Sequence, residues 1–421
     1  MEANERLKRP DGESVQLTPS WYASFHCIAG ACPQTCCQEW KIAVDADTLR
    51  RWKTVPCPDN PHKRLDSLTC RKEGSRVIRL NEKHLCPLLT GEKLCRLVLE
   101  HGEGMLSRTC QVFPREEHGF PHHSEKTLMP SCPEVLKGMQ AALTAGRDEI
   151  SGKAGIWVWW KREDWEQAFS RESGALQRAD SVRRFLMEGM ADESLSPEAA
   201  FQILFYVLLE LRGREQDGSF SAGLLAEWEE NGSLQALREQ VLSAGQDLSA
   251  GLAERNELLL DMTANYREQG MYRDTLEKLI RWAEAAADGE SDGRPGKASG
   301  SAWAAYRDFL RQKAALDPFL RLLLMEEIWA ECLDEEGDLT HMILKFEWLA
   351  LEYAVICQAL FLYFCHQGEL REELVSRLVV TVFRMTGYDD EDIEAYLEDC
   401  FDRPVWDWGY MALLQPLADR L

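Results

Sequence analysis

The spacing of hydrophobic and polar residues differs between the first third of the chain and the rest. After about residue 133, apolar residues recur with the period of an α-helix. The segment 196–215 shows this clearly, with Ser196 in the N-cap position and Pro197 in the first helical position. Its middle is apolar nearly all round, so we expect a buried helix rather than a surface helix.

Two further segments near the C-terminus follow the same pattern. Residues 346–367 are almost continuously apolar and predict another buried helix. Residues 371–401 predict two helices, which separate near Gly387. Residues 285–302 contain Gly, Ser, Asp and Pro without one large apolar residue, and this composition predicts a linker or loop.

The N-terminal part lacks such long periods. The segment 17–140 is interrupted by Pro and Gly and contains only short apolar runs. Residues 75–80 alternate between polar and apolar and predict a short strand. Residues 86–98 predict a small hairpin or a turn into a helix, with the bend at Thr90 and Gly91. A segment with so little regular structure needs cross-links to hold its shape.

These patterns predict a mainly α fold, in which an irregular, cysteine-rich N-terminal module is followed by a helical C-terminal domain. We expect the module at 1–140, a helical domain at 141–285 and a flexible linker at 286–302. A second helical region, at 303–421, is expected to pack against the first. The chain shows no internal repeat of fixed period.

The charge of the chain is acidic and unevenly distributed. The 421 residues carry a net charge of −23; residues 1–140 have a net charge of +2 and the remainder has −25. Nucleic acid is a poor partner for such a chain, because binding to phosphates requires an excess of Lys and Arg. The N-terminal residues lack the apolar core of a secretory signal, and no apolar run approaches the ~20 residues that span a bilayer. We therefore expect a cytoplasmic protein without membrane insertion.

Cysteine is concentrated in the first third of the chain. Ten of the fourteen cysteines and seven of the nine histidines lie at or before Cys132. The run at 27–37 has the spacing Cys-x4-Cys-x3-Cys-Cys, and Cys86-x8-Cys95-x14-Cys110-x21-Cys132 follows it. In a reducing compartment such clustering favours metal binding or catalysis over disulfides. Thiolates suit both Zn²⁺ and iron–sulfur clusters, so these residues alone leave both open.

The spacing differs from two common metal-binding patterns. The C-x2-C pairs of zinc ribbons and the C-x2-C-x2-C run of bacterial ferredoxins are both absent. The side chains of adjacent residues point apart unless the backbone turns sharply. Cys36 and Cys37 would therefore be able to bind different metal centres. We interpret Cys57, Cys70 and the four cysteines beyond Cys132 as small buried hydrophobic residues.

Four blocks of sequence carry a resemblance to a known family. The stretch LTPSWYASFHCIAGACPQTCCQEWKIAVD (17–45) is followed by CPLLTGEKLC (86–95), LSRTCQVFPR (106–115) and SCPE (131–134). In this order they resemble the flagellin lysine-N-methylase family, which is similar to cysteine-cluster proteins that chelate zinc or iron. The resemblance implies a cytoplasmic enzyme that methylates lysine ε-amines of flagellin. It also implies S-adenosylmethionine as methyl donor and a cysteine-bound, iron–sulfur centre.

The resemblance also implies the ligands of that centre. The family's cysteines correspond here to Cys27, Cys32, Cys36, Cys37, Cys86, Cys95, Cys110 and Cys132. Eight thiols suit two four-thiolate centres, or one centre together with four structural cysteines. We favour a single [4Fe–4S] centre, with zinc as the alternative, and a structural role for it.

Five further residues in the matching blocks are candidates for roles in methyl transfer. Tyr22, Asp45 and Arg115 are candidate catalytic residues, and Trp40, Arg115 and Glu134 are candidates for binding the cofactor. Aromatic rings accept a methylated ammonium through cation–π contact, and Arg115 can pair with a carboxylate of the donor. The competing interpretations are packing around a cluster for the aromatic residues, and capping or hydrogen bonding for the carboxylates.

No motif for methyl transfer accompanies these candidates. The radical S-adenosylmethionine signature C-x3-C-x2-C begins at Cys32 and Cys36 but fails at Glu39, which argues against a radical mechanism. We interpret His122 and His123 as solvated loop residues, and the WVWW stretch at 157–160 as an interdomain packing patch. The alternative function is a non-enzymatic iron–sulfur or zinc-binding protein, acting as a carrier, redox sensor or scaffold.

Overall fold

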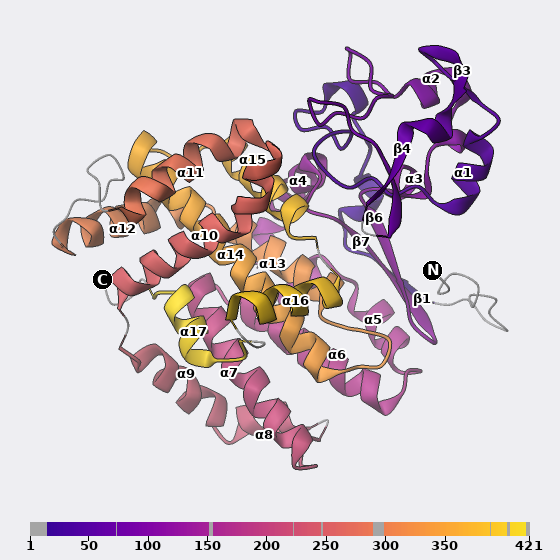
Figure 1. Cartoon of the computed structure of the whole chain (residues 1–421). Coiled ribbons are helices and arrows are strands. Elements are labelled where there is room, and N and C mark those ends of the chain that lie inside the picture. The colour runs from indigo at the N-terminus through magenta and orange to yellow at the C-terminus, as the bar shows by residue number, and fades with distance from the viewer. Residues whose placement is uncertain are drawn as a thin grey trace.

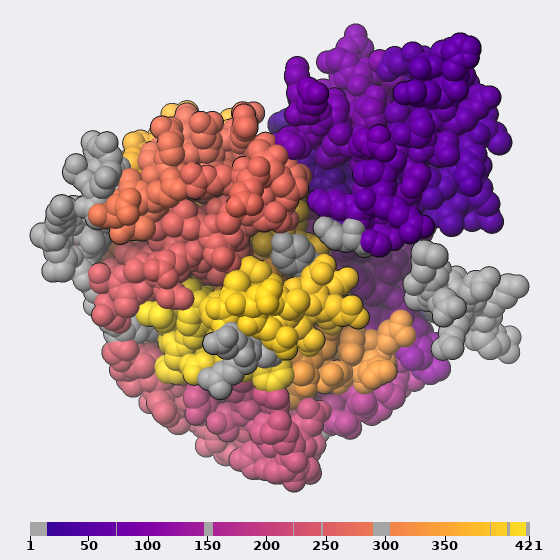
Figure 2. Space-filling view, in the orientation of Figure 1, coloured from indigo at the N-terminus to yellow at the C-terminus, as the bar shows by residue number. Residues whose placement is uncertain are grey.

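The computed structural model describes residues 15–72, 74–150, 155–221, 223–245, 247–288, 299–387, 389–401 and 405–417. Two regions of unequal size are visible in Figure 1. A cysteine lobe, which we define as residues 26–113, projects from a much larger helical body, which comprises the other described residues. Figure 2 shows the lobe standing out from the upper right of the body.

The cysteine lobe contains only short elements joined by turns. Two two-stranded ladders, β2 with β3 and β4 with β5, lie in it with three short helices. Several 3₁₀ turns connect them. The elements are α1 (Ala46–Trp52), β2 (Pro56–Cys57), β3 (Asn60–Arg64), β4 (Thr69–Lys72), β5 (Ser75–Ile78), α2 (Arg96–His101) and α3 (Arg108–Val112).

A three-stranded sheet joins the lobe to the helical body. Its order is β1 (Val15–Leu17), β7 (His123–Leu128), β6 (Arg115–Gly119), with β1 parallel and β6 antiparallel to β7. Leu17 and Leu128 of this sheet belong to the hydrophobic core of the body, not to that of the lobe. Although the chain passes from β1 into the lobe and returns through β6, the sheet itself is part of the body.

The body is otherwise helical, and its helices pack around one long central helix. The helices are α4 (Pro133–Ile150), α5 (Arg162–Phe169), α6 (Gly174–Ala191), α7 (Pro197–Gln216), α8 (Leu224–Glu230), α9 (Ser233–Ser243), α10 (Leu248–Gln269), α11 (Arg273–Ala287), α12 (Ser299–Lys313), α13 (Asp317–Glu331), α14 (Leu339–Gln367), α15 (Glu372–Met385), α16 (Asp390–Phe401) and α17 (Trp408–Leu414). Figure 1 shows α14 in the middle of this arrangement, with α10 and α13 beside it. A mainly α fold with an irregular N-terminal module is therefore confirmed.

The helices predicted from the sequence are present. Ser196 caps α7 by accepting a hydrogen bond from the backbone N–H of Ala199, and Pro197 is the first residue of the helix. The segment 371–401 forms α15 and α16. The helix predicted at 346–367 begins seven residues earlier, because Asp338 caps it from the loop before Leu339.

The predicted domain limits do not coincide with the ends of the observed helices. The limit at residue 140 lies inside α4, and the hydrophobic core of the body contains residues from both helical regions. Of the predicted linker 286–302, residues 289–298 lie outside the described residues, whereas its ends belong to α11 and α12. The division into domains remains a prediction.

α14 is long and apolar enough to cross a membrane by length and composition alone, so the expectation that no apolar segment reaches membrane length was wrong. In its most apolar stretch, 89% of the residues are buried inside the structure. Such burial is typical of the core helix of a soluble fold, and one such helix is weak evidence for a membrane span.

His123 corrects a second expectation. The side chain is fully buried in β7 rather than solvated. Its Nδ1 lies 2.7 Å from Glu172 and its Nε2 lies 3.2 Å from Glu125. Arg183 donates two hydrogen bonds of 2.8 Å to the Glu125 carboxylate, which completes a charged network in the interior of the body. His122 is exposed, as expected.

Candidate functional site

The first group of predicted ligand thiols lies where the cysteine lobe meets the body. It comprises Cys27, Cys32, Cys36 and Cys132, the last of which immediately precedes α4. Burial raises the pKa of the Cys132 thiol to about 11, and the thiols of Cys32 and Cys36 raise it further. Burial likewise raises the pKa of Cys32, with Cys36 and Cys27 adding to the effect. Cys36 thus acts on both Cys32 and Cys132, and Cys27 acts on Cys32, which places these thiols in one region of the fold.

A second group lies inside the lobe and comprises Cys86, Cys95 and Cys110. Burial raises the pKa of Cys86 to about 12, and the thiols of Cys110, Cys95 and Cys36 contribute to the rise. Burial also raises the pKa of Cys110 to about 11, again with contributions from Cys36 and Cys95. Cys36 is therefore close to members of both groups.

The chain turns at Cys36 and Cys37, so that these adjacent thiols hydrogen-bond to each other instead of pointing apart. This hydrogen bond is the largest cause that raises the pKa of Cys36, and burial is the second. The backbone carbonyl of Cys37 also accepts a hydrogen bond of 2.8 Å from the N–H of Cys86. The pair thus joins the two groups of thiols.

The thiols suit a thiolate-bound metal or iron–sulfur centre in donor type. In the parts of the chain that the structure describes, however, no three His, Cys, Asp or Glu side chains converge closely enough to hold a metal ion. All fourteen cysteines are free thiols. Cys57 belongs to the hydrophobic core of the lobe and donates a hydrogen bond of 3.1 Å to the carbonyl of Arg64.

Arg384 of α15 fastens the first group of thiols to the body. Its guanidinium donates to the backbone carbonyls of Gln34 (2.9 Å), Thr35 (3.1 Å) and Ser131 (3.0 Å). These carbonyls lie just before Cys36 and Cys132. Nothing in the sequence pattern of α15 pointed to this residue, because its partners are backbone atoms about 250 to 350 positions away.

Tyr22 and Arg115, two of the candidate catalytic residues, are brought together. Arg115 begins β6 and donates a hydrogen bond of 3.4 Å to the carbonyl of Phe25, whose ring lies 4.9 Å from its guanidinium. Burial raises the pKa of Tyr22, while Arg115 opposes the rise electrostatically. Arg115 thus joins the segment before the cysteine run to β6, through the ring and the backbone carbonyl of Phe25.

Asp45, the third candidate, is the N-cap of α1. Its carboxylate accepts hydrogen bonds from the backbone N–H of Thr48 (2.8 Å) and from that of Arg108 (2.9 Å). Burial by itself would raise the pKa of Asp45, but these hydrogen bonds outweigh it and lower the pKa to about 2. A carboxylate held in this way ties α1 to α3 and is a weak proton acceptor.

Trp40 and Glu134, the remaining candidates, flank different thiols. The indole N–H of Trp40 donates to the carbonyl of Cys36, and its ring packs 4.9 Å from that of Phe113. Glu134 lies in the first turn of α4 and pairs with Lys137 at 3.2 Å. Trp40 thus packs against the cysteine run, as one residue of the hydrophobic surroundings of these thiols.

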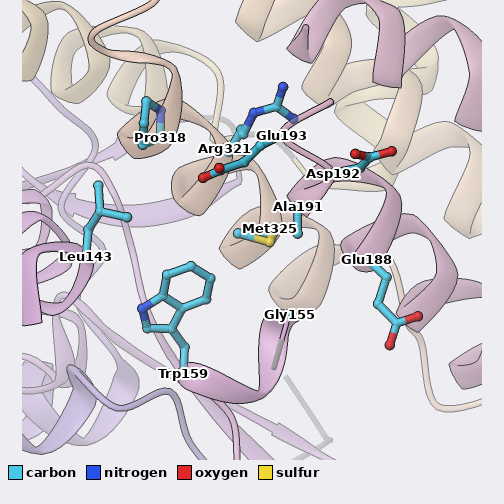
Figure 3. A pocket seen from close by; sticks show the side chains of 10 residues that line it. All are labelled: Leu143, Gly155, Trp159, Glu188, Ala191, Asp192, Glu193, Pro318, Arg321 and Met325. Carbon is cyan, nitrogen blue, oxygen red and sulfur yellow. The ribbon is translucent and has the colours of Figure 1, made fainter. Parts of the chain in front are cut away.

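A cavity of about 280 Å³ lies elsewhere, in the body, and none of these candidates lines it. Figure 3 shows it between Leu143 of α4, Trp159, the end of α6 and the first half of α13. Three carboxylates surround it, those of Glu188, Asp192 and Glu193. The sequence analysis treated the WVWW stretch as packing; Trp160 does pack, 5.5 Å from Trp21 and 5.6 Å from Trp329, whereas Trp159 faces this cavity.

Comparison with known proteins gives one family model and several relatives that are similar to this chain. Residues 183–414 match the family model described as the FliB lysine N-methylase C-terminal domain. The chain is 28% identical over 134 residues to the flagellar biosynthetic protein FliU of Salmonella muenchen, an alignment that covers 29% of this chain and 75% of that protein. No solved structure matches.

Two relatives carry the name lysine-N-methylase, one from Salmonella typhimurium and one from Salmonella choleraesuis. Each is 28% identical to this chain over 134 residues, which is 29% of this chain and 32% of the relative. The alignments thus span about a third of the length of these two proteins. The family model matches more than half of the chain, and the chain therefore belongs to the FliB lysine N-methylase family.

Proposed function

We propose that this protein is a lysine N-methyltransferase that acts on flagellin in the cytoplasm, before the flagellin is exported. The observation that carries the proposal is the match of residues 183–414 to the FliB lysine N-methylase C-terminal domain. The names of the relatives, lysine-N-methylase and flagellar biosynthetic protein, support the reaction and the flagellar context. The acidic body, which carries most of the net charge of −23, suits a substrate surface rich in lysine.

We propose S-adenosylmethionine as the methyl donor. In the reaction the lysine nitrogen forms a bond to the methyl carbon while the bond from that carbon to sulfur breaks, which leaves S-adenosylhomocysteine. The attacking amine must be neutral, yet a lysine amine has a reference pKa of about 10.4 and is protonated at neutral pH. The site must therefore desolvate the amine or offer a base that accepts its proton.

We also propose that the clustered thiols hold an iron–sulfur centre whose role is structural. The two neighbouring groups of thiols and the Cys36–Cys37 contact between them support this assignment. When bound, such a centre would link segments of the lobe that are far apart in the chain. Arg384 holds the backbone before Cys36 and Cys132, so it keeps two of the ligand segments against the body.

Co-expression with flagellin tests the proposed activity. Flagellin is produced with this protein, and separately without it, and its peptides are compared by mass spectrometry. We expect lysine peptides heavier by about 14 Da per methyl group only in the first sample. Unmodified lysines in both samples, from a culture in which the protein is soluble and loaded with iron, would favour the non-enzymatic, cluster-binding alternative.

A further inference from the structure

The segment 34–39, which contains the two adjacent thiols of the lobe, is fastened to the body at its first end. Arg384 of α15 donates hydrogen bonds to the backbone carbonyls of Gln34 and Thr35, at 2.9 Å and 3.1 Å. The side-chain amide of Gln34 donates in turn to the hydroxyl of Thr381, one helical turn before Arg384, at 3.1 Å. One helix of the body therefore fixes the start of this segment.

The other end of the segment is fastened to a different helix. The carboxylate of Glu39 accepts a hydrogen bond of 2.8 Å from the backbone N–H of Tyr272, the residue that precedes α11. The side-chain amide of Gln38 donates to the same carboxylate at 3.1 Å, and the backbone N–H of Glu39 donates to the carbonyl of His84 at 2.9 Å. A carboxylate is favoured in this position, because the helix dipole places positive charge at the N-terminus of α11.

Both residues of this contact have an unusual backbone conformation. Glu39 has a φ of 61° and Tyr272 has a φ of 51°, so both lie in the left-handed region that residues with a side chain rarely adopt. Such conformations are costly and persist only where the surrounding structure imposes them. The hydrogen bond between the two residues is one such constraint. We expect the turn before α11 to relax when Glu39 releases Tyr272.

Two tyrosines connect the ends of the segment through the body. The ring of Tyr272 packs against that of Tyr266 in α10, with the ring centroids 5.6 Å apart. The hydroxyl of Tyr266 donates a hydrogen bond of 2.5 Å to the carbonyl of Met385, the last residue of α15 and the neighbour of Arg384. These contacts form a closed path from α15 through the segment 34–39 to Tyr272, and back through Tyr266. A displacement at one end of the segment therefore acts on the other end.

The turn that Glu39 holds borders a cavity of about 460 Å³ in the body. Met271, the neighbour of Tyr272, is part of the wall of this cavity. Arg267 at the end of α10 and Arg273 at the start of α11 line it as well. The position of the turn therefore affects the shape of this cavity.

We propose that Glu39 is a positioning residue, which makes the turn between α10 and α11 depend on the state of the segment that contains Cys36 and Cys37. While this segment is ordered, Glu39 holds Tyr272 in its left-handed conformation and fixes one wall of the cavity. When a change at the thiols loosens the segment, the hydrogen bond opens and the turn relaxes. This link between the lobe and the body is independent of the reaction that the protein catalyses.

Hydrogen-exchange mass spectrometry of the full chain measures the turn through the amides of residues 270–276. We expect about tenfold faster exchange there in Glu39→Ala, because a lost contact of this kind at a helix N-terminus changes an equilibrium by about that factor. Glu39→Gln should stay close to the wild type, since its amide oxygen still accepts a hydrogen bond from Tyr272. Glu82→Ala is the matched control, because Glu82 is an exposed carboxylate of the same lobe, and it should exchange as the wild type does.

Combined substitutions test whether the thiol segment acts on the turn through Glu39. Cys36→Ser should speed up exchange at 270–276, and the double variant Cys36→Ser/Glu39→Ala should exchange no faster there than Glu39→Ala alone. Arg384→Met loosens the first end of the segment and leaves every thiol in place. It should also speed up exchange at 270–276 and add nothing to the effect of Glu39→Ala. This variant keeps the test decisive if Cys36→Ser does not fold.

Two kinds of result would overturn the link. Exchange at 270–276 that equals that of the wild type in Glu39→Ala, or in Arg384→Met, would show that the segment does not hold the turn. Effects of Glu39→Ala and Arg384→Met that multiply in the double variant would show that the turn responds to the lobe by a route other than Glu39.

Discussion

The cysteine lobe and the helical body achieve their folds in different ways. Among the described residues, the hydrophobic core of the lobe comprises nine buried residues, and two of them are cysteines. The core of the body extends from Leu17 to Leu414 and includes nearly the whole of α14. A core as small as that of the lobe rarely supplies more than about 3–5 kcal/mol, so the lobe needs additional cross-links.

The two regions also differ in where the thiols and the cavity lie. The cysteines that correspond to those of the family lie in the lobe and at its junction with the body. Burial raises the pKa of several of these thiols. The cavity with carboxylates and an indole ring lies in the body, within packed helices. The comparison therefore separates a lobe whose fold, as we propose, depends on its clustered thiols from a body that folds through hydrophobic burial. Four variants and one assay test this difference between the two regions.

The largest expected effect comes from Cys36→Ser, because Cys36 is a neighbour of both groups of thiols. Structural Zn²⁺ in zinc-finger peptides contributes about 10 kcal/mol or more to folding, and a centre that holds this lobe together should also have a large effect. We therefore expect loss of bound iron and fast hydrogen exchange throughout residues 26–113, with α14 still protected. Hydrogen-exchange mass spectrometry and metal analysis of the purified variant measure both.

Cys70→Ser is the matched control, since Cys70 lies in β4 of the same lobe and outside both groups. This variant should keep its iron and its protection. If Cys36→Ser retained the iron content and the slow exchange of the wild-type lobe, a structural centre at these thiols would be excluded.

The second effect concerns the body alone. Arg183 is fully buried and donates to Glu125 at 2.8 Å and to Asp180 at 3.1 Å. Arg183→Met removes the buried cation that these two carboxylates share, and breaking a buried pair in this way costs about 3–5 kcal/mol. Thermal unfolding should show this loss in the body, while the iron content of the lobe is unchanged. Arg184→Met is the control, because Arg184 is partly exposed and contacts Asp180 from the surface; a loss equal to that of Arg183→Met would contradict the account.

The third effect is a pH dependence that originates in the body. Burial raises the pKa of Glu326 from 4.5 to about 8. The charges of Glu116 and Glu125 raise this pKa further, whereas the backbone N–H of Leu128 lowers it. Neither carboxylate oxygen has a hydrogen-bond partner among the described residues. The folded state thus binds a proton that the unfolded state releases, so stability falls as pH rises from about 4.5 to about 8 and then levels off.

Glu326→Gln removes this titration. We expect the variant to match the wild type near pH 4.5 and to be more stable by about 4–5 kcal/mol near pH 8.5. Denaturant titrations at the two pH values provide the measurement. A difference between variant and wild type that does not change with pH would show that Glu326 is ionised in the folded protein.

The smallest effect should appear at the contact between the two regions. Arg384→Met removes three hydrogen bonds to the carbonyls of Gln34, Thr35 and Ser131, for which we expect a cost of about 2 kcal/mol. The lobe should then exchange amide hydrogens faster at 27–37 while its own core stays protected. Arg377→Met, on the same helix, serves as control. Unchanged exchange at 27–37 would show that other contacts dock the lobe.

Much of the helical architecture was accessible from the sequence, because it depends on local signals. The Ser196–Pro197 start of α7 and the break near Gly387 between α15 and α16 are decided within a few residues. The start of α14 at Leu339 was missed, because Lys345 interrupts the apolar pattern just before the predicted start at 346. The fold buries this side chain.

The candidate sites were less accessible, because they depend on contacts between distant segments. The role of Arg384 follows from carbonyls at Thr35 and Ser131, which no pattern within α15 reveals. His123 looked like a loop residue, but Glu125 and Glu172 hold it in the interior. Trp159 belongs to a packed aromatic stretch, and only the helices around it show that it faces a cavity.

The most direct test of the central claim is methyl transfer by the purified protein. Anaerobically prepared protein is incubated with flagellin and S-adenosylmethionine that carries a deuterated methyl group, and the flagellin peptides are analysed by mass spectrometry. The account predicts labelled methyl groups on lysine side chains of the flagellin. Unlabelled lysines after incubation with folded, iron-loaded protein would contradict it.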